Sequence, residues 1–168
     1  MKAIMERRSI RKYKSDPVPE ESVKALLEAA MAAPSAGNGQ PWHFVVVDDR
    51  DKLNTITGFH LYSQMLKEAP MAIIVCGDVT NERYQGFWVQ DCAAATENIL
   101  IKATDIGLGT VWLGLYPNES HLENMKKLLE LPEGIVPMSM IAVGHPAEEK
   151  PPADRYNEER VHWNRWSR

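Results

Sequence analysis

Cysteine is scarce in this chain, in which Cys76 and Cys92 are the only two among 168 residues. Both lie in apolar runs without the spacing of metal ligands, so we expect buried free thiols and a cytoplasmic location, where thiols stay reduced. The histidines are also scattered without ligand spacing, so no metal site is expected. They are His43, His60, His121, His145 and His162.

Long apolar runs are absent as well. None approaches the length of a membrane span and no signal peptide opens the chain, so no membrane association is expected. The formal net charge of −4 argues against bulk binding of nucleic acid. With 44% hydrophobic and 25% charged residues, the composition is that of a globular protein, and we expect one domain over residues 1–168.

A loop of small and amide residues, 33–42, separates an amphipathic run from an apolar one. Pro34 ends the preceding helix, because proline lacks an N–H and disfavours helical geometry in the residue before it. Gly37 and Gly39 let the backbone approach a ligand closely. Side chains able to read a polar ring edge are Ser35, Asn38 and Gln40. An ordinary surface turn favours the same residues and stays an alternative.

A basic segment near the N-terminus reads Arg7-Arg8-Ser9-Ile10-Arg11-Lys12-Tyr13. Guanidinium groups bind phosphate through paired, charge-assisted hydrogen bonds, and a serine hydroxyl adds another. The segment therefore predicts a phosphate site. A solvated basic face and a nucleic-acid or other phospholigand module are the alternatives.

Hydrophobic periodicity predicts helices that alternate with strands, which indicates a layered α/β or α+β fold. We expect helices at residues 1–8, 19–33, 50–57, 60–68, 84–106 and about 118–129. The expected strands are residues 42–47, 71–76, 110–115 and 136–143. The small residues Ala93, Ala94 and Ala95 suit either a dimer-core helix or a buried helix of a monomer.

The last segment, residues 144–168, is proline-rich and then carries aromatic residues among charges. A free tail bearing Tyr156, Trp163 and Trp166 would expose a large apolar area, which monomers avoid. We therefore predict an extended arm that packs along a partner subunit.

The basic segment and the loop, in this order, resemble the nitroreductase family of FMN-dependent oxidoreductases. That family has a short helix with an Arg-Arg-Ser-x-Arg-like segment, a second helix, a Pro-Ser-x-x-Asn-x-Gln-Pro-Trp loop and a strand. The resemblance implies a nitroreductase-like α+β fold, with a central mixed or antiparallel sheet flanked by helices. It also implies a homodimer that exchanges its C-terminal extension, and FMN as the cofactor.

The resemblance also implies the residues that hold the cofactor, carried over by matching motifs. Those for the phosphate and ribityl chain are Arg7, Arg8, Ser9 and Arg11, with Arg155 from the tail. Those that wall the flavin from the other subunit are Pro34, Ser35 and Asn38, joined by Gln40. The backbone of Leu113 and Gly114 is expected at the reactive ring edge, and Gln64 stands where several relatives carry lysine. Glutamine lacks the cation that stabilises an anionic reduced ring.

The implied reaction is ping-pong transfer from NADH or NADPH, through FMN, to a nitroaromatic, a quinone or a similar small acceptor. The flavin carries the chemistry, so no catalytic protein residue is expected. Aromatic side chains suit either a flat substrate slot or core packing, namely Trp42, Phe59, Tyr62, Phe87 and Trp112. Alternative functions are a non-enzymatic flavin carrier or sensor, and a different flavin reaction such as dehalogenation, dehydrogenation or flavin breakdown.

Overall fold

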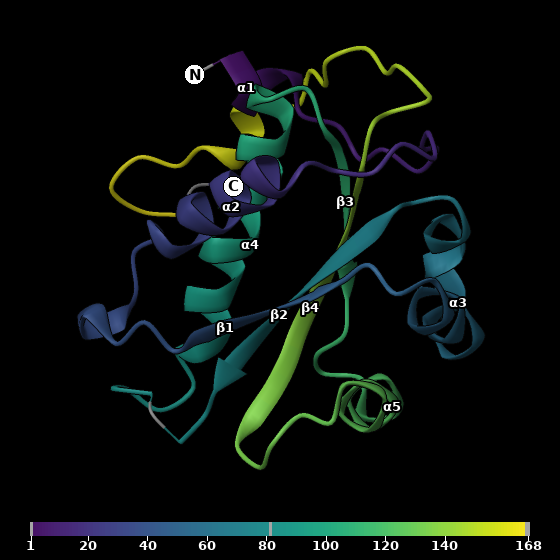
Figure 1. Cartoon of the computed structure of the whole chain (residues 1–168). Helices are drawn as coiled ribbons and strands as arrows, with labels where there is room; N and C mark the ends of the chain where they lie inside the picture. The colour runs from purple at the N-terminus through teal and green to yellow at the C-terminus, as the bar shows by residue number, and fades with distance from the viewer. Residues whose placement is uncertain (1, 81, 167–168) are drawn as a thin grey trace.

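A computed structural model describes residues 2–80 and 82–166 as a layered α+β fold (Figure 1). The strands are β1 (Trp42–Val47), β2 (Met71–Asp78), β3 (Gly109–Gly114) and β4 (Ile135–Gly144). The α-helices are α1 (Lys2–Glu6), α2 (Glu20–Met31), α3 (Arg50–Phe59), α4 (Trp88–Asp105) and α5 (Glu119–Leu129). Short 3-10 helices are η1 (Ala36–Asn38), η2 (Leu61–Lys67) and η3 (Glu158–Arg160).

The four strands form one sheet in the order β1-β2-β4-β3, and every neighbouring pair of strands is antiparallel. Ile141 of β4 lies opposite Ile73 of β2 on one side and Trp112 of β3 on the other. A parallel pairing occurs only as an isolated bridge between Ser9 and Thr110, within the described residues. The resemblance implied either a mixed or an antiparallel sheet, and the observed sheet is antiparallel.

Helices cover both faces of the sheet, with α2 and α4 on one side and α3 and α5 on the other (Figure 1). Side chains of a strand alternate between faces, so Ile73 and Val75 pack in the α2–α4 core while Ala72 and Ile74 pack in the other. Because both faces are buried, β2 is an unbroken apolar run rather than an alternating one.

The two cysteines confirm the expectation of buried free thiols. Both side chains are fully inaccessible, and burial raises the pKa of Cys76 and of Cys92 to about 12. They therefore remain protonated at neutral pH and behave as small apolar groups of the core.

Three predicted helices differ from those of the structure. The helix expected over residues 84–106 begins only at Trp88, because Gly86 adopts a φ of +83°. The helix expected over residues 60–68 is the 3-10 helix η2, since His60 before it is extended. The first helix ends at Glu6, so Arg7 and Arg8 lie beyond its last turn and not within it. Met1 lies outside the described residues.

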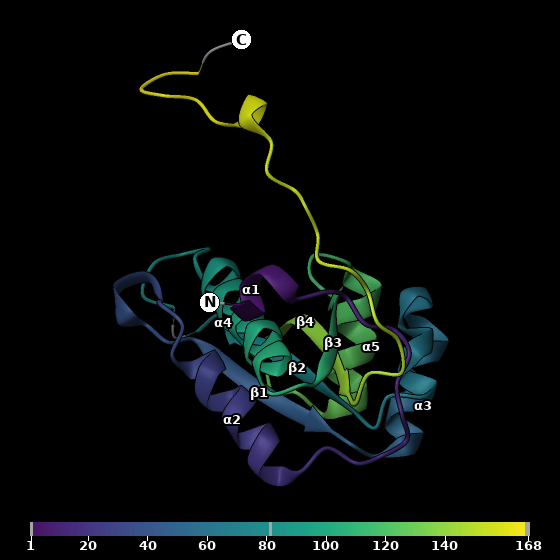
Figure 2. The ribbon, with the colours of Figure 1, turned by 90° about the horizontal axis from the view of Figure 1, so that it is seen from above.

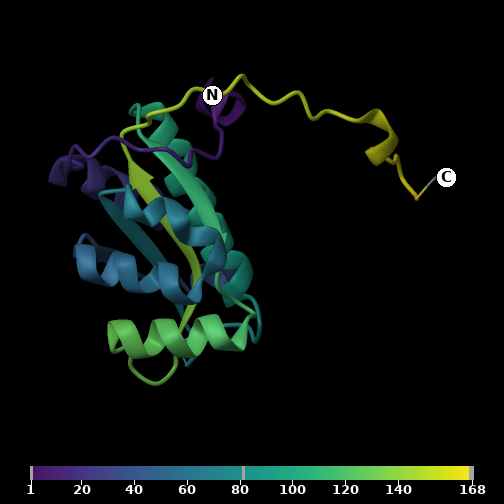
Figure 3. The same cartoon turned by 90° about the vertical axis from the view of Figure 1, so that its right-hand side faces the viewer.

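The two ends of the chain run side by side before they part. Lys14 N donates to His145 O at 2.9 Å, and Ala147 N donates to Lys12 O at 2.9 Å. Beyond Pro151 the arm leaves the body of the molecule and carries η3 away from it (Figures 2 and 3). Among residues 2–80 and 82–166, no helix combines the length and apolar character needed to cross a bilayer.

Candidate functional site

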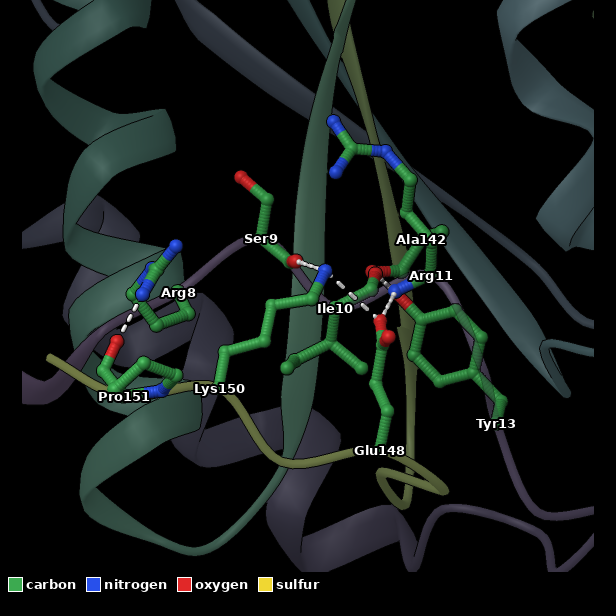
Figure 4. Close-up of polar contacts among 9 residues, drawn as sticks. All are labelled: Arg8, Ser9, Ile10, Arg11, Tyr13, Ala142, Glu148, Lys150 and Pro151. Carbon is green, nitrogen blue, oxygen red and sulfur yellow. Dashed lines mark hydrogen bonds and ion pairs between the residues drawn. The ribbon is translucent and has the colours of Figure 1, made fainter. Parts of the chain in front are cut away.

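The basic segment is tied to the start of the C-terminal arm (Figure 4). Glu148 accepts a hydrogen bond from the backbone N–H of Arg11 at 2.6 Å and pairs with Lys150 at 3.1 Å. Lys150 also donates to the carbonyl of Ser9 at 2.7 Å, and Arg8 donates to the carbonyl of Pro151. The Arg11 N–H, followed by Lys150, holds the pKa of Glu148 below its usual value. The segment therefore has a fixed course along the end of the sheet.

Arg11 presents its backbone and its side chain to different partners. Its N–H faces Glu148, while its guanidinium points away from that carboxylate (Figure 4). The side chain is exposed and lines a cavity of about 650 Å³. A permanently charged group at the wall of such a cavity suits an anionic ligand.

The cavity lies where the end of β3, the 3-10 helix η2 and the start of α5 meet. Of the residues that the sequence assigns to the site, it brings together Arg11, Gln64, Leu113 and Gly114. The remaining lining residues are His60, Leu61, Tyr62, Met65, Trp112, Leu115, Tyr116, Pro117, Asn118 and His121.

Two features of the wall fit a flat ring. Gly114 is exposed, and a Cβ added to it would meet no atom within 4 Å, so its missing side chain leaves ligand space rather than relieving a clash. Trp112 is half-buried and Tyr62 is exposed, and both line the cavity. The Gln64 amide donates to Thr57 O at 3.0 Å, so this neutral side chain is anchored on α3.

The sequence did not predict that two histidines lie together at the cavity. His60 Nε2 lies 3.0 Å from the carbonyl oxygen of Gly114, and the rings of His60 and His121 have centroids 4.4 Å apart. The two residues are far apart in the chain and have no motif around them, so no local signal could have paired them. Within the described part of the chain, no group of three metal-ligating side chains was found.

Three predicted phosphate residues take other partners. Arg7 forms an ion pair with Glu97 of α4 at 3.0 Å, and Arg8 holds the Pro151 carbonyl. Ser9 bridges to Thr110 of β3 and accepts from Lys150 through its backbone. None of these three lines the cavity that Arg11 lines.

The predicted flavin-wall loop lies at η1, away from α3 and α5 (Figure 1). Within the loop, the Ser35 hydroxyl accepts from Gln40 N at 3.0 Å, and Asp91 of α4 accepts from Ala36 N at 2.9 Å. The exposed side chains of Pro34, Asn38 and Gln40 do not line the cavity. A single chain therefore does not bring the loop to the cavity.

Arg155 lies in the extended arm and is exposed, and it is not among the described residues that line the cavity at Arg11. The other aromatic residues considered for a slot divide between core and surface. Trp42 is buried in the α2–α4 core, Phe59 packs against the opposite core, and Phe87 is exposed beside Tyr84.

The chain is thus a layered α+β protein with an antiparallel sheet and an open cavity that Arg11, Gly114 and aromatic side chains line. The model of the "Nitroreductase family" matches residues 4–59 and 58–145. The chain belongs to the nitroreductase family.

The comparisons with individual proteins agree with this assignment. The chain is 47% identical to the "Putative NADH dehydrogenase/NAD(P)H nitroreductase" of Methanothermobacter thermautotrophicus, over 99% of this chain and 87% of the relative. A crystal structure of a protein of the same name from Parabacteroides distasonis superposes with a TM-score of 0.95 at 41% identity, covering 98% of this chain and 97% of that one. The "FMN-dependent Nitroreductase" of Clostridium difficile R20291 gives 0.91 at 29% identity, covering 99% and 100%.

Proposed function

We propose that this chain is an FMN-dependent NAD(P)H oxidoreductase that passes electrons to a nitroaromatic, quinone or similar small acceptor by a ping-pong mechanism. The observation that carries the proposal is the meeting of Arg11 and the exposed Gly114 at one cavity of about 650 Å³. Support comes from the names of the relatives, which include an NAD(P)H nitroreductase and an FMN-dependent nitroreductase.

The chain's own residues would bind and orient the cofactor. Arg11 would bind the phosphate by charge-assisted hydrogen bonds, with the Glu148 contact to its backbone fixing where the side chain starts. The backbone at Leu113 and Gly114 would lie along the ring, where no side chain intervenes. When bound, FMN supplies the hydride chemistry.

A second subunit would complete the site. The loop of Pro34, Ser35, Asn38 and Gln40 lies outside the cavity of its own chain, so it would wall the flavin bound by a partner. The arm of residues 144–168 would pack on that partner and bring Arg155 toward the phosphate. Arg7, Arg8 and Ser9 would complete the phosphate-binding site. Residues 1–168 would then form one domain with an exchanged arm.

Purified protein saturated with FMN tests the proposal directly. We expect a yellow complex whose absorbance bleaches on anaerobic addition of NADH or NADPH and recovers when a quinone or nitroaromatic is added. Bleaching without recovery by any acceptor would contradict the proposed transfer. A complex that neither donor bleaches would be a flavin carrier or an enzyme with another donor.

Arg11→Ala tests the site itself. We expect weaker FMN binding by about 1.5–3 kcal/mol, the usual contribution of a hydrogen bond to a charged group. Lys12→Ala is the matched control, because Lys12 is also an exposed cation of the segment but does not line the cavity. Equal FMN affinities of the two variants, measured by fluorescence titration, would remove Arg11 from the phosphate site.

A further inference from the structure

One carbonyl at the cavity wall is held by a histidine. His60 Nε2 lies 3.0 Å from Gly114 O, and a carbonyl oxygen only accepts, so Nε2 carries the proton. In the neutral ring this leaves Nδ1 as a lone pair, which fits its environment: it is buried, with no hydrogen-bond partner among the described residues. The His60 side chain is only 2% exposed, so its orientation is fixed by packing.

The backbone of His60 is fixed as well. Its N–H donates to Ile56 O at 3.0 Å, and its carbonyl accepts from both the N–H and the hydroxyl of Ser63, at 3.0 and 2.7 Å. His60 is thereby locked between the end of α3 and the start of η2. A donor held at both ends can position whatever accepts from it.

His121 packs against the ring of His60. Its ring lies over that of His60 with centroids 4.4 Å apart and planes at 33°, and its Nδ1 is likewise buried, with no partner in the described chain. Burial first, and then the neighbouring His60, lower the pKa of His121, while the Gly114 backbone opposes them. The neutral form of His121 is therefore favoured.

Besides the two histidines, the peptide that carries this carbonyl has few restraints. Gly114 ends β3 and is exposed, and the lack of a Cβ leaves its backbone free of side-chain restraint. The N–H of the same peptide, on Leu115, shares its acceptor, Met138 O, with Tyr116 N at 3.2 and 3.1 Å. A shared acceptor restrains a donor less than one of its own.

We propose that His60, backed by His121, is a positioning residue that engages the Gly114 carbonyl and so keeps this acceptor from a ring bound in the cavity. The inference rests on the proposed flavin function and deepens it. A carbonyl turned into the cavity would accept a hydrogen bond from an N–H group of a bound ring. It would thereby favour the reduced form of a flavin, which carries such a group at N5. Because His60 occupies this carbonyl, the ring lacks that acceptor, and the reduction potential of the site is lower than it would be otherwise.

The FMN midpoint potential of three variants tests the proposal. In His60→Leu the carbonyl is released, and we expect a positive shift; a tenfold change in the affinity ratio for reduced over oxidised FMN equals about 30 mV in a two-electron couple. His60→Gln keeps an N–H donor in reach of the carbonyl and should restore most of the wild-type value. His43→Leu, an exposed histidine on β1, is the control and should not change it.

A second readout needs no cofactor and covers the case in which His60→Leu does not fold. In long-range ¹H–¹⁵N spectra of the wild-type protein without FMN, we expect a proton on Nε2 of His60. A ring whose only proton is on Nδ1 would overturn the inference. So would wild-type potentials in a folded His60→Leu that binds FMN and is reduced by NAD(P)H, an outcome that leaves the proposed function intact. Failure of the wild-type protein to bind FMN would overturn both.

Discussion

At the scale of single residues, Arg11 shows how backbone and side chain can serve different partners. Glu148 binds its N–H at 2.6 Å, and the guanidinium is left to face the cavity. The sequence predicts the arginine, because its local motif contains it. It does not predict Glu148, because a carboxylate 137 residues away has no sequence relation to its partner.

His121 gives the protein a pH-dependent stability. Its pKa is lowered in the folded state, so between that value and the ordinary pKa of about 6.5 the unfolded chain binds more protons. Stability therefore falls as pH drops through this range. We expect the free energy of unfolding, from urea titrations, to decrease as the pH falls below about 6.5, and His121→Gln to flatten that dependence.

His43→Gln serves as the control for this measurement, because His43 is exposed on β1 and lies outside the cavity. It should retain the wild-type slope. Glu148 also has a lowered pKa, so it makes stability depend on pH only below about pH 4.5, outside the range of this measurement. Parallel slopes for wild type and His121→Gln would contradict the prediction.

At the scale of elements, the loop around η1 combines three residues in left-handed backbone conformations. Gly37, Asn38 and Gln40 all have positive φ, at 56°, 56° and 50°. Asparagine and glutamine reach this region only at a cost, so the surroundings must hold them there. The Arg83 side chain does so in part, by donating to the Gly37 carbonyl at 2.8 Å.

Two glycine substitutions compare this loop with a helix. In Gly37→Ala the new Cβ would approach Arg83 Cδ to 2.6 Å and Tyr84 Cε2 to 2.8 Å at a positive φ, so we expect destabilisation of about 1–3 kcal/mol. Gly58→Ala lies inside α3, where a Cβ meets nothing within 4 Å, and should stabilise by about 0.5–1 kcal/mol. Thermal denaturation measures both, and the same sign of effect in the two variants would refute the argument.

At the scale of the whole molecule, the aromatic residues of the arm remain exposed on their own chain. Tyr156, Trp163 and Trp166 are 79%, 82% and 80% exposed, and the arm extends away from the sheet (Figure 3). Aromatic surface of this size is expected to pack against another protein surface. The proposed dimer supplies that surface, and it supplies the flavin-wall loop as well.

Deleting residues 156–168 tests this arrangement. We expect the truncated chain to dissociate at concentrations where the full chain is a dimer by light scattering, and to bind FMN more weakly, because the partner's loop is lost with the partner. Glu158→Gln together with Arg160→Gln is the control, since it changes charges of η3 and keeps every aromatic residue. An unchanged, stable dimer after truncation would contradict the proposal that the arm packs on a partner subunit.

The sequence by itself determined the family, the strands and most helices, because these depend on short motifs and on periodicity within one segment. Residues 71–76 predicted β2 from their unbroken apolar run, and the basic segment with the proline-bounded loop identified the family. Helix starts were less accurate, since Gly86 and the extended His60 override propensity locally.

Only the tertiary structure decided which of the candidate residues meet. It placed Arg11, Gln64 and Gly114 at one cavity, and it left the flavin-wall loop and Arg155 elsewhere. It also joined His60 to His121, and Glu148 to Arg11. Such contacts depend on how the sheet and helices pack, and packing brings together residues whose separation along the chain carries no signal.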